Sequence, residues 1–299
     1  MIIPNSLRKG DCIGIISTAR KISLDDLNYT IKILEDWGLN IVLGDNLFEE
    51  YHQFAGTIDK RRCDLQSMID NKEIKAILCA RGGYGTVQII DNIDFSSLKK
   101  NPKWIIGYSD ITVLHSHLNN LGFASIHGTM PINFSSNTKE SLMSLYNSLF
   151  NFTNKIIYNT DTINMPANIE SSIVGGNLSI LYSLMGSNSD INTDGKILFL
   201  EDVDEYLYHI DRMTINLLRN NKFKKIKGLI IGAMSNMNDN KIPFGNTAKG
   251  IILENLRQFN FPIIENFPAG HQKDNRTIIL GVNSYVEIRE NHVILSQSY

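Results

Sequence analysis

The segment WIIGYSDITVLH, residues 104–115, places a serine at the point where an apolar run passes into a helical pattern. Two interpretations are open here. Ser109 or Asp110 could cap the following helix through a side-chain oxygen, as serine and aspartate commonly do. Alternatively, a tight turn could present the hydroxyl of Ser109 to a cleft as a nucleophile. The second interpretation needs a base and a carboxylate from elsewhere in the chain.

A serine nucleophile requires a base within hydrogen-bond reach and a carboxylate that orients this base. His127 ends a predicted strand, whereas His271 follows a predicted strand through the turn Pro-Ala-Gly. Loops just past strand ends commonly present catalytic groups, which favours His271 over His127. Glu201 ends the apolar run ILFLE, and a carboxylate that is half buried there needs a partner. A histidine would serve as this partner, but so would a structural salt bridge.

The glycine-rich segment ARGGYG, residues 80–85, also follows an apolar run. It lacks the Gly-Lys-Ser/Thr ending of a phosphate-binding P-loop. Adjacent glycines let backbone N–H groups converge on an anion or an oxyanion. A tight turn with positive φ would need the same residues. The segment is therefore a second candidate part of the site.

An alternation of strands and helices must position these segments. Apolar runs predict strands at residues 12–17, 40–44, 76–80, 104–107 and 124–127, and helical spacing predicts helices at 23–38, 60–69, 86–93 and 110–121. Such alternation is typical of a parallel sheet, whose ligands bind beyond the carboxyl ends of the strands. Both ARGGYG and GYSD lie at such ends.

The second half begins after a segment rich in serine and asparagine. We expect an N-terminal domain over residues 1–135, a linker region over 136–168 with a helix near 140–150, and a C-terminal domain over 169–299. In the last of these, a glycine turn is expected to lead into a helix within 174–186. Further strands are predicted at 196–203, 226–234 and 262–267, helices at 206–218 and 247–259, and antiparallel strands at 277–281, 285–289 and 292–297.

The composition limits the class of function. The 299 residues include 29 Lys and Arg and 31 Asp and Glu, a formal net charge of −2. This balance argues against nucleic acid as the main partner, because phosphate binding needs a concentrated positive field. No apolar run is long enough for a membrane span and no secretory signal is recognisable, so we expect a cytoplasmic protein with no membrane partner. Three widely spaced cysteines predict thiols rather than disulfides or metal ligands.

Several long segments resemble, in the same order, the LD-carboxypeptidase family of serine peptidases. They are FAGTIDKRRCDLQSMI (54–69), IKAILCARGGYG (74–85), DFSSLKKNPKWIIGYSDITVLH (94–115), SIHGTMP (125–131), IVGGNLSIL (173–181), ILFLEDVDEYLYHIDRM (197–213) and PAGHQ (268–272). The resemblance covers nearly the whole chain. It implies an α/β fold with a Rossmann-like, mostly parallel N-terminal sheet, a smaller, mostly β C-terminal domain, and an active site in the cleft between them.

The resemblance also implies a Ser–His–Glu triad. GYSD corresponds to the nucleophile at Ser109, FLED to the glutamate at Glu201, and AGH to the base at His271. The backbone N–H groups of Asp110 and Gly83 would form the oxyanion hole. Neither a metal nor another cofactor is implied.

Family members release a terminal D-amino acid from an L-centre, typically D-alanine from diaminopimelate or lysine in cytoplasmic murein tetrapeptides, during peptidoglycan recycling. The resemblance therefore implies a carboxypeptidase that acts on a small peptide through an acyl-enzyme, and it also implies a homodimer. A carboxypeptidase must hold a free carboxylate. Arg81 or the amides of Gly82 and Gly83 could do so, although Arg81 could equally form a structural ion pair.

Two other functions stay open. Immunity peptidases of this fold destroy peptidyl-nucleotide antibiotics such as microcin C, and in that branch a lysine follows the triad glutamate by four residues. Glu205 stands at this position here, and its carboxylate could bind the amine of diaminopimelate or lysine, which favours the carboxypeptidase. Asn177 could contact substrate or cap a helix. The last alternative is a non-catalytic small-molecule binding module, which the intact segments around Ser109, Glu201 and His271 disfavour.

Overall fold

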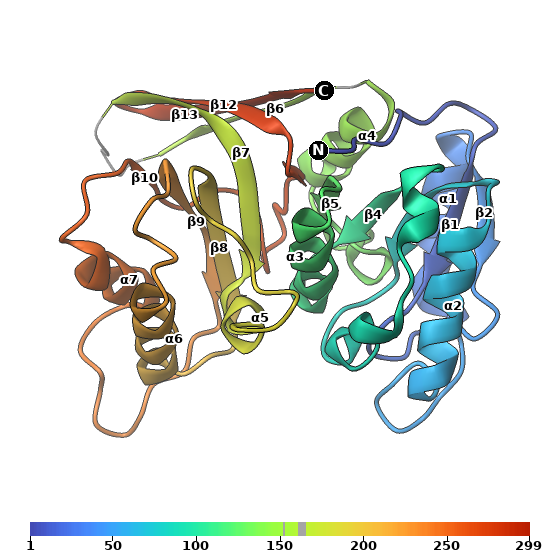
Figure 1. Ribbon diagram of the computed structural model, residues 1–299, viewed down its shortest axis with the longest axis horizontal. Coiled ribbons are helices and arrows are strands. Elements are labelled where there is room, and N and C mark those ends of the chain that lie inside the picture. Colours follow the sequence, from blue (N-terminus) through green and yellow to red (C-terminus); the bar gives the residue numbers. More distant parts are fainter. Residues whose placement is uncertain (152, 161–165) are drawn as a thin grey trace.

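Two β-sheets with flanking helices lie side by side in the computed structural model, which describes residues 1–151, 153–160 and 166–299 (Figure 1). The first sheet has the strand order β11-β5-β4-β3-β1-β2. Its strands are β1 (Cys12–Ile16), β2 (Asn40–Leu43), β3 (Ile74–Cys79), β4 (Trp104–Gly107), β5 (Ser125–His127) and β11 (Ile278–Leu280). The first five pair in parallel, which confirms the predicted strands of the N-terminal half.

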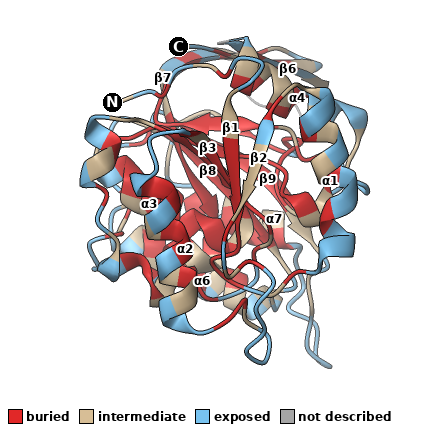
Figure 2. Ribbon diagram, turned by 90° about the vertical axis from the view of Figure 1, so that its right-hand side faces the viewer, coloured by how far each residue is buried: buried red, intermediate tan, exposed pale blue. Residues whose placement is uncertain are grey.

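Helices cover both faces of the first sheet. They are α1 (Leu24–Asp36), α2 (Ile58–Asp70), α3 (Thr112–Asn120) and α4 (Lys139–Phe150). Apolar side chains of α1 and α4 pack on one face, and those of α2 and α3 pack on the other. Figure 2 shows the result: the strands are buried, while the outer sides of the helices are exposed. This two-sided cover explains why the strands read as continuous apolar runs in the sequence.

The helix predicted at residues 86–93 is not present as such. The segment instead forms two short 3-10 turns, η1 (Thr86–Gln88) and η2 (Ile90–Asn92). Tertiary contacts hold the first of them: the N–H of Thr86 donates to Asp110 Oδ2 over 2.8 Å, and Arg61 Nη1 donates to the carbonyl of Gly85 over 2.9 Å. Contacts between distant segments therefore override the helical spacing.

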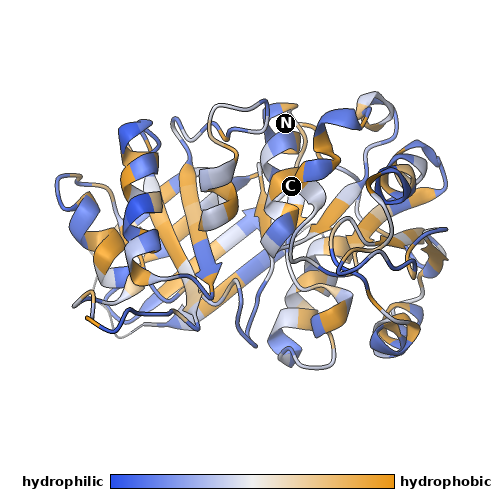
Figure 3. Cartoon of the chain, turned by 90° about the horizontal axis from the view of Figure 1, so that it is seen from below, coloured by the Kyte–Doolittle hydropathy of each residue, from blue (hydrophilic) through white to orange (hydrophobic). Residues whose placement is uncertain are grey.

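The second sheet has the order β10-β9-β8-β7-β12-β13-β6. Its strands are β6 (Thr153–Asn159), β7 (Ala167–Asn177), β8 (Ile197–Val203), β9 (Gly228–Ser235), β10 (Ile263–Ile264), β12 (Asn283–Ile288) and β13 (His292–Ser298). Strands β7 to β10 pair in parallel, and the remaining pairs are antiparallel. Figure 3 shows largely apolar strands, with polar residues on the outer sides of the helices.

Three helices cover one face of the second sheet: α5 (Leu178–Ser183), α6 (Leu207–Arg219) and α7 (Ala248–Leu256). Both sheets are thus mixed, and both halves combine strands with helices. Among the helices of the described residues, none is long and apolar enough to span a membrane.

Two strands were not predicted. Strand β6 lies within the region 136–168, which was predicted to be a linker after a helix near 140–150, and α4 is that helix. Strand β7 runs through Gly175 and Gly176, where a turn was predicted. Residues 152 and 161–165 of the predicted linker lie outside the described part of the chain.

Several contacts join the two halves, among them two that involve strands of the sheets. Strand β11, from the C-terminal region, pairs antiparallel with β5 at the edge of the first sheet, with Ile278 opposite His127. Helix α3 packs against β7, where the N–H of Asn177 donates to Thr112 Oγ1 over 3.0 Å. A Cβ at Gly176 would lie only 2.5 Å from Thr112 Oγ1, so this close approach requires glycine.

Candidate active site

Ser109 lies at the turn between β4 and α3, at the start of the 3-10 turn η4 (Ser109–Ile111). Its φ is 63°, in the left-handed region that non-glycine residues seldom occupy. Neither η4 nor α3 has a side-chain cap, so neither Ser109 nor Asp110 serves as the helix cap considered above. A serine in a strained strand-to-helix turn is the arrangement that exposes a nucleophile in many hydrolases.

The buried carboxylate of Asp110 ties this turn to the glycine-rich segment. Its Oδ2 accepts a hydrogen bond from the N–H of Thr86 over 2.8 Å. Burial raises the pKa of Asp110, and the nearby cations Arg61 and Arg20 oppose this effect. Arg61 is itself buried and donates through Nη1 to the carbonyls of Thr18 and Gly85. These two buried side chains thus connect the three loops that follow β1, β3 and β4.

The loop after β3 runs directly against Ser109. A Cβ at Gly82 would lie 2.9 Å from Ser109 Cβ and 3.1 Å from its Oγ. Gly83 has a φ of 110°, and no described group accepts a hydrogen bond from its backbone N–H. This N–H therefore stays available at the edge of the cavity described below.

Glu201 and His271 form a buried pair. Glu201 Oε2 and His271 Nδ1 are 2.6 Å apart, and the same oxygen accepts from the backbone N–H of His271 over 3.1 Å. Ser235 Oγ donates to the carbonyl of His271 over 2.6 Å. These contacts fix both the ring and the backbone of the histidine. They also orient its Nε2 away from the carboxylate.

Glu201 and His271 each stabilise the charged form of the other. Burial disfavours the ionised form of Glu201, but the charge and hydrogen bonds of His271 outweigh it and lower the pKa of this carboxyl. Burial likewise disfavours the imidazolium of His271, and the carboxylate of Glu201 outweighs it and raises the pKa of this ring. The site therefore stabilises a positive charge on His271 next to a negative charge on Glu201.

Local backbone irregularity brings the two residues together. The register between β8 and β9 shifts between Leu200 and Asp202, which leaves Glu201 at a β-bulge. Bulges often re-aim a side chain next to an active site. Gly270, with a φ of 105°, precedes His271, and a Cβ there would lie 2.7 Å from Glu201 Oε2. Only glycine permits this approach.

Aromatic residues surround the pair. The ring of Tyr108, the neighbour of Ser109, has its centroid 4.8 Å from that of His271. His127, the other histidine considered, is fully buried against Phe199 and Tyr108. Burial lowers its pKa to about 4, and within the described residues neither ring nitrogen has a hydrogen-bond partner. The histidine that pairs with Glu201 is therefore His271.

Ser109 and His271 line one cavity of about 690 Å³. Its wall from the first half carries Arg20 and Arg81, and its wall from the second half carries Asp204 and Glu205. The cavity thus presents cations on one side and carboxylates on the other.

Of the three candidate substrate-binding residues, Arg81 and Glu205 line the cavity and Asn177 does not. Arg81 lines the cavity and donates through Nη1 to the carbonyl of Lys21 over 3.2 Å, and no ion pair is found for it within the described residues. Glu205 lines the cavity too, with its Oε2 2.6 Å from His209 Nδ1. Asn177 is buried and caps α5, where its Oδ1 accepts from the N–H of Ile180.

Four polar residues of the cavity lining were missed in the sequence: Arg20, Asn133, Asp204 and Asn236. Arg20 follows β1, so the rule that drew attention to the ends of β3 and β4 could have found it as well. Asp204 and Asn236 have φ values of 60° and 52° and stand just after β8 and β9. Positive φ at aspartate and asparagine leaves no reliable pattern in a single sequence.

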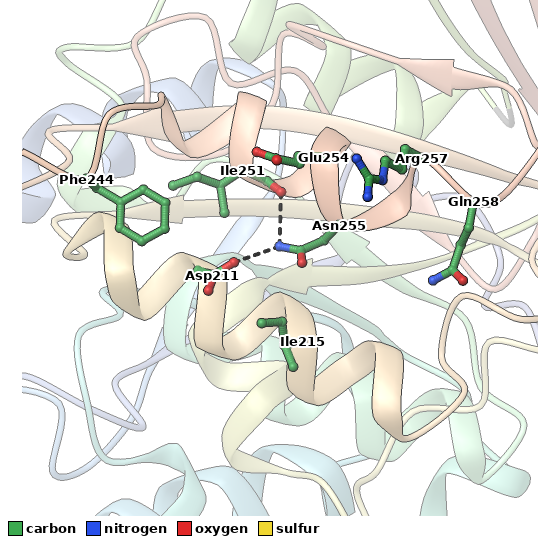
Figure 4. Close-up of a pocket in the computed structure, with 8 residues that line it drawn as sticks. All are labelled: Asp211, Ile215, Phe244, Ile251, Glu254, Asn255, Arg257 and Gln258. Carbon is green, nitrogen blue, oxygen red and sulfur yellow. Dashed lines mark hydrogen bonds between the residues drawn. The ribbon is translucent and has the colours of Figure 1, made fainter.

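A second hollow of about 660 Å³ lies between α6 and α7 (Figure 4). Asn255 of α7 donates to Asp211 Oδ1 of α6 over 2.8 Å, which connects the two helices, and to the carbonyl of Ile251 within α7 over 3.1 Å. Its lining contains neither serine nor histidine, so it offers no nucleophile and base. No cluster of three or more His, Cys, Asp or Glu residues suited to a metal ion is found in the described part of the chain.

Comparison with known families gives a match in each half. Residues 13–128 match the LD-carboxypeptidase N-terminal domain, and residues 170–286 match the LD-carboxypeptidase C-terminal domain. A probable murein peptide carboxypeptidase from Bacillus subtilis is 33% identical over 305 residues, which cover 98% of this chain and 93% of that protein. A murein tetrapeptide carboxypeptidase from Pseudomonas aeruginosa is 28% identical and covers 92% of each chain.

Solved structures share the fold. The muramoyltetrapeptide carboxypeptidase from Oxalobacter formigenes superposes with a TM-score of 0.88 at 24% identity, over 96% of this chain and 99% of that one. The microcin C7 self-immunity protein MccF, in complex with aspartyl sulfamoyl adenosine, superposes with a TM-score of 0.87 at 21% identity. That match covers 100% of this chain and 99% of the other.

Proposed function

Since the chain belongs to the LD-carboxypeptidase family, we propose that it is a serine carboxypeptidase that releases terminal D-alanine from murein tetrapeptides. The observation that carries this proposal is the shared cavity. It is lined by a serine in a strained turn and by a histidine whose Nδ1 is 2.6 Å from a buried glutamate.

Ser109, His271 and Glu201 act as nucleophile, base and orienting carboxylate in this proposal. The Oγ of Ser109 attacks the scissile carbonyl while His271 Nε2 takes its proton. The same imidazole then returns the proton to the departing amine of D-alanine, which leaves an acyl-enzyme on Ser109. Water, activated by His271, hydrolyses this ester. Glu201 holds the tautomer with hydrogen on Nδ1 and stabilises the imidazolium.

The negative charge that develops on the carbonyl oxygen needs donors that are already in place. We assign this role to the backbone N–H groups of Gly83 and Asp110. The N–H of Gly83 borders the cavity without a described acceptor. That of Asp110 follows the nucleophile directly, at the first turn before α3. The loop that carries Gly83 and the turn that carries Ser109 are joined through Asp110 Oδ2 and Thr86.

The substrate peptide would span a cavity with opposite charges on its two walls. Arg81 could bind a carboxylate, and Glu205 could bind the amine of diaminopimelate or lysine in the third position of the peptide. The side chain of Asn177 already serves a helix cap. We further propose that residues 1–135 and 169–299 act as domains on either side of this cavity, in a cytoplasmic protein that works in peptidoglycan recycling as a homodimer.

The nearest alternative is an immunity peptidase that cleaves peptidyl nucleotides of the microcin C type. It is favoured by the fold shared with MccF. The carboxylate of Glu205 at the cavity wall would repel phosphate, which favours the murein peptide instead.

The test is D-alanine release from free murein tetrapeptide. We expect release by the wild type and a fall in rate of at least about 10³-fold in Ser109→Ala, because the nucleophile is lost. Ser183→Ala is a matched control, since its hydroxyl only bonds the carbonyl of Ile180 within α5. If the wild type leaves murein tetrapeptide intact and cleaves a peptidyl nucleotide, the immunity function replaces the proposed one.

A further inference from the structure

We infer that Arg20 binds the carboxylate of the substrate's terminal residue and thereby makes the site specific for a free chain end. This inference deepens the proposed function and rests on it. Arg20 lines the same cavity as Ser109 and His271, and it comes from the loop after β1.

The backbone of Arg20 is fixed on several sides. Its N–H donates to the carbonyl of Gly82 over 3.4 Å, and its own carbonyl accepts from Ser17 Oγ over 2.5 Å. It also forms an isolated antiparallel bridge with Phe54. The side chain therefore projects from a defined point beside the glycine-rich loop, although the residue itself is exposed.

The side chain of Arg20 lies across Gly83. A Cβ at Gly83 would be 2.6 Å from Arg20 Cδ and 2.8 Å from its Nε. The absence of a side chain at Gly83 is thus what allows the arginine to lie here. The result is a cation directly beside the N–H group that we assign to the oxyanion hole.

The guanidinium of Arg20 keeps its donors free. Within the described residues it makes neither an ion pair nor a hydrogen bond, whereas the adjacent Lys21 is paired with Glu50 over 2.6 Å. Arg81, the other arginine of the cavity, already donates one hydrogen bond to the carbonyl of Lys21. A free guanidinium presents a planar fork that matches both oxygens of a carboxylate.

The chemistry of the substrate requires a group that binds a carboxylate close to the reacting atoms. In a peptide that loses its last residue, a single Cα links the terminal carboxylate to the scissile nitrogen. The carboxylate must therefore lie close to the oxyanion hole when the carbonyl is in place. Of the two arginines that line the cavity, Arg81 belongs to the loop of Gly83 itself, whereas the side chain of Arg20 lies over Gly83 from the loop after β1.

The experiment compares two substrates: free murein tetrapeptide and the same peptide with its terminal D-alanine as the carboxamide. For the wild type we expect a higher kcat/KM with the acid than with the amide. In Arg20→Met, which keeps the length of the side chain but not the charge, the ratio of the two kcat/KM values should fall about 10- to 100-fold. Arg20→Lys should recover part of the ratio, because it restores the charge without the fork.

Two further variants sharpen the comparison. Arg62→Met is the matched control, because Arg62 lies on α2, outside the cavity lining, next to Asp59. We expect it to keep the wild-type ratio. Arg81→Met tests the rival arginine, and a collapse of the ratio there but not in Arg20→Met would overturn the inference.

The remaining outcomes are equally decisive. An unchanged acid-to-amide ratio in Arg20→Met overturns the inference while the proposed function stands. A parallel fall with both substrates also overturns it, because Arg20 would then only support the Gly83 loop. If the wild type releases nothing from either peptide, the proposed function fails and the inference fails with it.

Discussion

A buried carboxylate that is hydrogen-bonded to a histidine is the centre of the site at the scale of single residues. Glu201 is fully buried, and one of its oxygens carries both hydrogen bonds to His271. Its other oxygen has no partner in the described part of the chain. The carboxylate therefore depends on His271 for its charge, and His271 depends on the carboxylate for its orientation.

The first prediction concerns pH. The pKa of His271 is raised above its ordinary value of about 6.5, and in its proposed role as general base the ring must be neutral to accept a proton. The kcat/KM for D-alanine release should therefore rise with pH, with a midpoint above about 6.5. In Glu201→Gln the charge that favours the imidazolium is lost while burial stays. The pKa of His271 then falls, and the midpoint moves to lower pH along with a lower maximal rate.

The measurement is the pH profile of kcat/KM for the wild type and Glu201→Gln, together with an NMR titration of the His271 ring. His292→Gln serves as a control for the titration, because this residue lies on β13 in the second sheet. Identical midpoints in the wild type and Glu201→Gln would contradict an electrostatic role for Glu201.

At the residue scale, much of the site can be predicted from the amino-acid sequence. Ser109, Glu201 and His271 are identifiable because each follows an apolar strand pattern and lies in a segment that resembles the family. Their spatial relation is not predictable in this way. The bulge at Glu201 and the positive φ of Ser109 depend on contacts between segments far apart in the chain. Arg20 was missed because the rule on strand ends was applied to β3 and β4 and not to β1.

At the scale of elements, the short helix α5 depends on the residues at its start. Asn177 Oδ1 accepts from the N–H of Ile180 over 3.1 Å, and its Nδ2 donates to Asp202 Oδ1 over 2.8 Å. Asp202 also accepts from the N–H of Ser179. Burial and the neighbouring Glu201 raise the pKa of Asp202 to about 7. One amide therefore serves both a helix end and a buried carboxyl group.

The second prediction separates a structural role of Asn177 from substrate binding. Asn177→Ala removes the cap and a donor to Asp202, so the free energy of unfolding should fall by about 2 kcal/mol. Urea denaturation measures this loss, and Asn177→Ser, which keeps a capping oxygen, should recover part of it. A rise in KM without a loss of stability would show instead that the side chain binds substrate.

The two strands that were not predicted were missed for different reasons. In β6, buried and exposed residues largely alternate, but the polar residues between the apolar ones made the segment resemble a linker. In β7, Gly175 and Gly176 suggested a turn. Glycine is required within this strand for a steric reason, because a Cβ at Gly175 would lie 2.0 Å from the carbonyl oxygen of Phe199 on β8. A single sequence does not reveal which neighbour a glycine must admit.

At the scale of the whole molecule, each half contributes an element that pairs with or packs against the sheet of the other half. The last third of the sequence supplies β11 to the first sheet, and α3 packs on β7 of the second. The candidate site lies where the halves meet, since Ser109 belongs to the first and the pair of Glu201 and His271 to the second. Relative movement of the halves would therefore alter the site directly.

The third prediction follows from this shared strand. Thermal unfolding should occur as one cooperative transition, because unfolding of the second half withdraws β11 and exposes the edge of β5. Differential scanning calorimetry measures this, with equal calorimetric and van't Hoff enthalpies as the expected result. Two separate transitions, or a folded fragment of residues 1–135 with full stability, would contradict it.

The same strand sets an order of events during synthesis on the ribosome. An N-terminal domain ordinarily folds while the rest of the chain is still being made. Here the sheet that carries Ser109 gains its edge strand only after residues 278–280 have emerged. Until then β5 presents an open edge, which is a template for wrong pairing with other chains. The nascent chain consequently exposes this edge until residues 278–280 have been made, and the sheet that carries Ser109 is completed late.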